Sequence, residues 1–145
     1  MNDLSAPPRN FDQEQTPPAG VDSIEAQADA EKNILRVRYH GHVTAQIMEN
    51  HLAELSGLLP SLEAGFVLAT DLSDLRSMDL DCSAGLMKVM DRIKAHGVGA
   101  IARLIPHPER EIGFAILSQF HYPADIRIIT CETAEEFEKL LSDDD

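Results

Sequence analysis

The sequence predicts an α/β fold with a mainly parallel sheet of five strands, an N-terminal β-hairpin and four helices. Apolar and polar residues alternate in two short segments around residue 30, which is the pattern of a hairpin. From residue 44 onward, segments with the apolar spacing of a helix alternate with short apolar runs, as in strands joined by crossover helices. With 145 residues, of which 43% are hydrophobic, the chain has the size of one domain with a single core.

The hairpin is expected in the segments SIEAQAD and ILRVRYHG, which the turn residues EKN separate. Thr44 follows it and can cap a helix whose apolar face recurs at Met48, Leu52, Leu55 and Leu59. The run from Phe66 to Ala69 has the continuous apolar character of a strand that is buried on both faces. We expect this strand to end in a loop after Leu72.

The second half of the chain repeats the alternation of helix and strand. A helix with a one-sided apolar stripe is expected to end at Gly97, and GAIARLI and DIRIIT are predicted as a second and a third central strand. A further helix is predicted over residues 109–120. The segment TAEE matches a capping box, with Thr133 and Glu136 opening the last helix.

Composition defines the ends of the domain and excludes several kinds of partner. Residues 1–20 hold four prolines and few apolar residues, so we predict a disordered tail, an ordered domain over 21–141 and a frayed acidic end at 142–145. A formal charge of −13 repels phosphate backbones, so nucleic acid is not an expected partner. Two distant cysteines and no long apolar run favour a reducing cytoplasm without membrane insertion.

Several segments together resemble one known family. They are GHVT after the hairpin, VLATDLSDLRSMD on the third strand and its loop, RIKAHG at the end of a helix, and TAEEFEKLL at the C-terminus. Over residues 24–141 the chain resembles the STAS domain, the family of bacterial anti-sigma factor antagonists and the related SpoIIAA-like group. The resemblance implies a regulatory protein-binding module that is not an enzyme, needs no cofactor, and has an anti-sigma factor or kinase as its partner.

The family's phosphorylated members carry a serine directly after an aspartate in this loop, and the present sequence departs from that motif. Aligning Asp79 with the aspartate puts Leu80 at the acceptor position, and leucine has no hydroxyl. A shift of two residues aligns Asp81 and puts Cys82 there, followed by Ser83, which is a weak alternative acceptor. The usual phosphorylation switch is therefore not expected in either alignment.

The residues Asp79, Leu80, Asp81, Cys82 and Ser83 form the candidate partner-binding site. Loops beyond the carboxyl ends of parallel strands commonly carry function, which favours docking there together with the face of the following helix. Helix capping by Asp79, Asp81 and Ser83 is an alternative that is compatible with docking. Catalysis by paired carboxylates lacks a partner group in the sequence. Cys82 could be a reactive thiol of lowered pKa or a small buried residue.

Two other hypotheses involve different residues. His40 and His42 stand two apart on one strand and could begin a metal site, but no third ligand is identifiable, so no metal is predicted. As an alternative function, a lipid-like apolar ligand could be bound, as the SpoIIAA-like resemblance implies. The residues for that pocket would be Phe114, Leu117, Phe120 and Tyr122, whose other interpretation is ordinary core packing.

Overall fold

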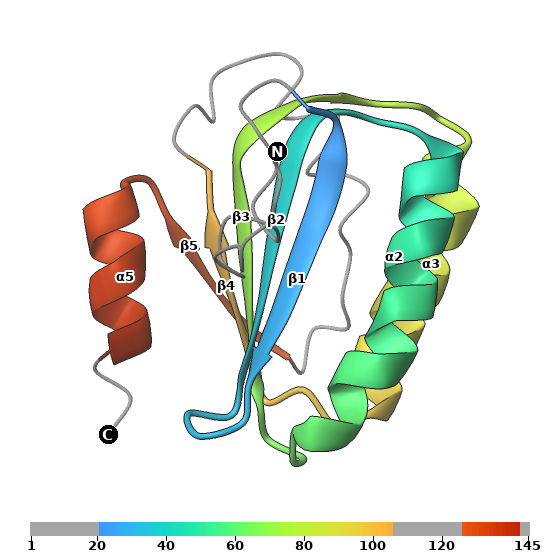
Figure 1. Cartoon of the computed structure of the whole chain (residues 1–145). Helices are drawn as coiled ribbons and strands as arrows, with labels where there is room; N and C mark the ends of the chain where they lie inside the picture. Colours follow the sequence, from blue (N-terminus) through green and yellow to red (C-terminus); the bar gives the residue numbers. More distant parts are fainter. Residues whose placement is uncertain (1–20, 106–125, 143–145) are drawn as a thin grey trace, which may run out of the picture.

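The computed structural model describes residues 21–105 and 126–142. Its elements, drawn in Figure 1, are β1 (Ser23–Asp29), β2 (Ile34–Val43), α2 (Ala45–Leu58), a short 3-10 turn (Leu59–Ser61), β3 (Val67–Met78), α3 (Cys82–Ala95), β4 (Ala100–Leu104), β5 (Arg127–Cys131) and α5 (Ala134–Ser142). The predicted helix over residues 109–120 lies outside the described residues, so the described part holds three helices.

The five strands form one mixed sheet in the order β1-β2-β3-β4-β5. Strands β1 and β2 pair antiparallel, as the predicted hairpin requires, and each of the following neighbours pairs parallel. Helices α2 and α3 cover one face of this sheet, and α5 lies on the other face (Figure 1). Among the described residues, no helix is long and apolar enough to cross a membrane.

Two strand predictions are corrected. Strand β3 does not end in a loop after Leu72 but continues to Met78, because its second half pairs with the second half of the long strand β2. Leu75 is buried on this extension and supplies the apolar contact that keeps it on the core. Strand β5, predicted to be central, lies at the edge of the sheet, where the exposed side chain of Arg127 is accommodated.

A single asparagine fixes the turn between β1 and β2. Asn33 has a positive φ of 58°, a backbone conformation that asparagine tolerates better than most residues. Its amide donates to the carbonyl oxygen of Glu63 at 3.1 Å, and its side-chain oxygen accepts from the Glu63 N–H at 2.8 Å. The hairpin turn is thereby joined to the segment that leads into β3.

The predicted helix ends are confirmed where they depend on local chemistry. The Thr44 hydroxyl accepts a hydrogen bond from Ile47 N–H at the start of α2. Gly97 follows α3 with a φ of 96°, a conformation that favours glycine. The Thr133 hydroxyl accepts from Glu136 N–H, whereas the Glu136 carboxylate accepts from Glu132 N–H, one residue earlier than in the predicted capping box.

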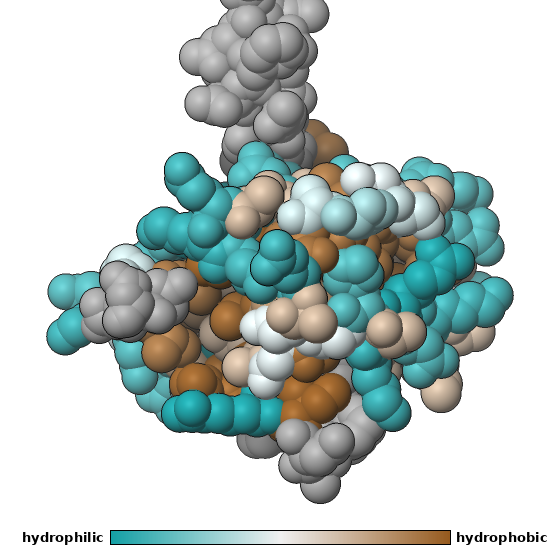
Figure 2. Space-filling view, turned by 90° about the horizontal axis from the view of Figure 1, so that it is seen from below, coloured by the Kyte–Doolittle hydropathy of each residue, from teal (hydrophilic) through white to brown (hydrophobic). Residues whose placement is uncertain are grey.

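The main core lies between the sheet and the pair α2 and α3. It includes Phe66, which is completely buried, and Met48, whose side chain lies close to Gly85 where the two helices approach each other. A smaller core beneath α5 contains Phe137 and Cys131. Figure 2 views the end of the molecule that carries the β1–β2 turn, where hydrophilic residues form most of the rim and apolar residues are visible between them.

Candidate partner-binding site

The predicted site lies where β3 passes into α3, at the carboxyl ends of the parallel strands and at the top of the molecule in Figure 1. Its loop is short, because β3 ends only at Met78 and α3 begins at Cys82. Two hydrogen bonds attach it to the end of β2, since the Asp79 N–H and the Cys82 thiol both donate to the Val43 carbonyl oxygen, at 3.0 and 3.3 Å. The loop is therefore held in one position on the sheet.

The side chain of Asp81 does not cap α3. Asp81 occupies the N-cap position with helical φ and ψ of −61° and −17°, and its side chain makes no capping hydrogen bond. The Cys82 and Ser83 N–H groups instead donate to the carbonyl oxygens of Asp79 and Leu80, at 3.0 and 3.1 Å. The backbone thus begins to coil before the helix, and these N–H groups need no carboxylate.

The carboxylate of Asp79 contacts His42, a residue that the sequence suggested only as part of a possible metal site. Its Oδ1 lies 2.8 Å from His42 Nε2, while His42 Nδ1 is hydrogen-bonded to the Ser77 hydroxyl. The backbone N–H of His42 donates to Asp22 Oδ1 at 3.0 Å. The histidine therefore connects the end of β2 to the loop, and nothing in the sequence pattern marked this pair.

Cys82 is completely buried, and its thiol points away from the surface toward β2. Burial raises the pKa of the Cys82 thiol, and the nearby Asp79 carboxylate raises this pKa further. This direction is opposite to the lowering that a reactive thiol requires. Of the two alternatives for Cys82, a reactive thiol or a small buried residue, the structure supports the second. Ser83 beside it is exposed.

The surface of this site is partly apolar. Leu80 is 82% exposed and Met87 is 59% exposed, and both stand out among the large hydrophobic residues of the described chain. Because the backbone is already helical at Asp81, residues 80, 84 and 87 follow the spacing of one helix face. We call the exposed residues Leu80, Asp81, Ser83, Ala84 and Met87 the 80–87 surface. Met87 is the member that sequence reasoning did not single out.

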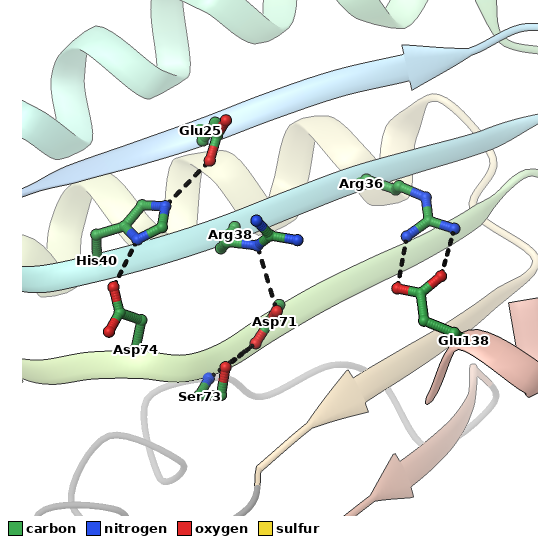
Figure 3. A network of polar contacts seen from close by, with 8 residues as sticks. All are labelled: Glu25, Arg36, Arg38, His40, Asp71, Ser73, Asp74 and Glu138. Carbon is green, nitrogen blue, oxygen red and sulfur yellow. Dashed lines mark hydrogen bonds and ion pairs between the residues drawn. The ribbon is translucent and has the colours of Figure 1, made fainter. Parts of the chain in front are cut away.

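A polar network covers part of the face of the sheet that carries α5 (Figure 3). The ring of His40 lies between two carboxylates, with Nδ1 2.7 Å from Asp74 Oδ2 and Nε2 3.0 Å from Glu25 Oε1. Further along, Arg38 pairs with Asp71 at 3.3 Å. No group of three or more histidine, cysteine or acidic residues within 21–105 and 126–142 could hold a metal ion.

A second arginine of this network joins α5 to the sheet. Both terminal nitrogens of Arg36 donate to the Glu138 carboxylate, at 3.0 and 3.1 Å (Figure 3). Each arginine is thus already neutralised by a carboxylate. The residues of the alternative apolar pocket, Phe114, Leu117, Phe120 and Tyr122, lie outside the described residues.

No family model matches the sequence, and no curated protein matches it closely. The structure is similar to that of a protein of the DUF3478 family from Shewanella loihica, described as having a SpoIIAA-like fold. That pair shares 13% identity with a TM-score of 0.63, over 87% of this chain and 99% of the other. The fold is SpoIIAA-like. The anti-sigma factor antagonist SpoIIAA, solved in its unphosphorylated form, also superposes with a TM-score of 0.55 and 14% identity, over 83% of this chain and 99% of SpoIIAA.

Proposed function

We propose that this SpoIIAA-like domain is a non-catalytic regulatory module that binds a protein partner through the 80–87 surface. The observation that carries the proposal is the exposure of Leu80 and Met87 at the carboxyl end of the sheet. SpoIIAA, which has the same fold, is an anti-sigma factor antagonist, and this supports a regulatory role for the fold. The partner in the proposal is an anti-sigma factor or a kinase.

The energetics of the surface favour a protein partner. Fully burying a leucine or methionine side chain contributes about 1.5–3 kcal/mol, so two such residues can serve as anchors at the centre of an interface. Asp79 and Asp81 flank the anchors with negative charge, and the chain as a whole carries a charge of −13. A partner with a basic rim around an apolar pocket would be attracted to this surface and oriented on it.

The proposed module does not depend on phosphorylation at the position used in the family's switch. Leu80 has no hydroxyl, and in the shifted alignment Cys82 is buried with its thiol bonded to a backbone carbonyl. Ser83 is exposed at the start of α3, where a phosphate would lie near the positive end of the helix dipole. Ser83 is therefore the residue to examine if the module is modified in cells.

The test is an affinity capture from host lysate, followed by measurement of binding with the purified partner. The variant Leu80→Glu plus Met87→Glu changes only exposed side chains, so the domain is expected to fold normally. We expect it to weaken partner binding by at least about tenfold, because two apolar anchors are lost. The matched control is Val21→Glu, which changes an exposed hydrophobic residue outside the surface.

Either of two results would contradict the proposal. One is that the double variant and the Val21→Glu control bind the partner equally. The other is that every protein captured by the wild-type domain is also captured by the double variant. A third variant, Asp79→Lys plus Asp81→Lys, separates charge from apolar contact, because it should mainly slow association and change its salt dependence.

A further inference from the structure

A groove runs between the edge strand β1 and helix α2. It has a volume of about 490 Å³, within the range of small-molecule sites. It is lined by Asp22, Ser23, Ile24, Ile47, Asn50, His51 and Glu54. Strand β1 pairs with β2 on one side and is the edge strand among the described strands, so the groove follows that edge of the sheet.

The most unusual group in the groove is His51. Its side chain is only 2% exposed, and neither ring nitrogen has a hydrogen-bond partner among the described residues. Its ring makes an edge contact with Tyr39, with centroids 6.3 Å apart. The buried hydroxyl oxygen of Ser23 also has no partner in the described part of the chain. Buried polar atoms are normally hydrogen-bonded, so both side chains can bind a ligand's polar group.

The charge of the groove selects the kind of ligand. Burial lowers the pKa of His51 to about 4, so at neutral pH the ring is uncharged and one nitrogen accepts a hydrogen bond. The carboxylates of Asp22 and Glu54 both line the groove, and no lysine or arginine is among its described lining residues. A cation would be attracted to these two carboxylates, whereas an anion would be repelled by them. Ile24 provides an apolar wall.

We propose that this groove binds a small primary amine with an apolar body. His51 and Glu54 stand three residues apart on α2 and so lie on the same side of the helix. An ammonium group has three N–H donors, which match the His51 ring nitrogen, the Glu54 carboxylate and the Ser23 hydroxyl oxygen. The apolar body would lie on Ile24 and Ile47. This site is distinct from the proposed partner-binding surface and does not depend on it.

The test uses 2-phenylethylamine as the probe and phenylacetate as a control of similar size and opposite charge. Binding is followed by NMR, through the ring protons of His51 and the backbone amides of β1 and α2. We expect saturable shifts with the amine and binding at least about tenfold weaker with the acid. Equal affinity for the two probes, or no saturable shift up to about 10 mM amine, would overturn the proposal.

Two variants locate the ammonium group. Glu54→Gln removes the carboxylate at the groove, while the control Glu49→Gln makes the same change on an exposed part of α2 that does not line it. We expect Glu54→Gln to weaken amine binding about tenfold and Glu49→Gln to change it by less than about twofold. Ser23→Ala should weaken it as well. If Glu54→Gln and Glu49→Gln bind the amine equally well, the assigned site is wrong.

Discussion

Replacing His51 by leucine tests how strongly this buried histidine makes folding sensitive to acid. The folded state holds the His51 pKa at about 4, whereas the ordinary value of 6.5 applies to the unfolded chain. The neutral ring is therefore favoured by folding, and the unfolded state binds the proton first as pH falls. This contribution to stability is complete above pH 6.5 and is lost as the pH falls from 6.5 toward 4.

The size of the effect follows from the difference between the two pKa values. One pKa unit corresponds to about 1.36 kcal/mol, so the difference between 6.5 and about 4 amounts to roughly 3 kcal/mol. His51→Leu removes the titrating group and keeps an apolar side chain of similar size. We therefore expect the difference in unfolding free energy between His51→Leu and wild type to grow by about 3 kcal/mol between pH 7 and pH 4.

Urea unfolding at several pH values measures this difference directly, because the other titrating groups are shared by both proteins and cancel. Leu55→Met is the matched control, since it changes a buried residue on the same helix without adding or removing a titratable group. Its effect on stability should be independent of pH. A pH-independent difference between His51→Leu and wild type would refute the assignment of the low pKa to His51.

Two further predictions concern backbone conformation and the thiols. Gly57→Ala should raise the unfolding free energy by about 0.5–1 kcal/mol, because alanine favours a helix and nothing lies within 4 Å of the added methyl group. Gly97→Ala should lower the unfolding free energy by more than about 1 kcal/mol, because Gly97 has a φ of 96° and the new Cβ would lie 3.0 Å from Ala64 Cβ. Equal effects of the two glycine substitutions in chemical denaturation would contradict this expectation. Cys82 and Cys131 are both buried with raised thiol pKa values, so a thiol reagent at pH 8 should label them only after denaturation. Fast labelling of Cys82 in the folded protein would show that its surroundings open readily.

The elements that sequence patterns predicted correctly are those determined by neighbouring residues. The alternation of Leu35, Val37 and Tyr39 locates β2 because all three side chains enter the core. Thr44 and Gly97 mark helix ends because a side-chain hydroxyl and a positive φ act within one turn. In each case the physical cause lies within a few residues of the element, so a single sequence contains it.

The features that were missed depend on residues far apart in the chain. The extension of β3 to Met78 follows from its pairing with β2, and a polar segment such as SDLRSM does not by itself indicate a strand. The contact between His42 and Asp79 joins the end of β2 to the loop after β3, which only the parallel pairing of the two strands brings together. The exposure of Met87 could have been predicted from the sequence, because an apolar residue that falls outside the buried stripe of a helix is exposed.

The order of strands in the sheet is the same as their order along the chain. Each described strand after the first therefore pairs with the described strand that precedes it in the chain, and none of these five has to insert between two strands that are already paired. During synthesis on a ribosome, the β1–β2 hairpin can form first, because its two strands are joined by a short turn. The remaining described strands, β3, β4 and β5, can then join in turn at the edge formed by β2, which leaves β1 as the outer strand of the described sheet.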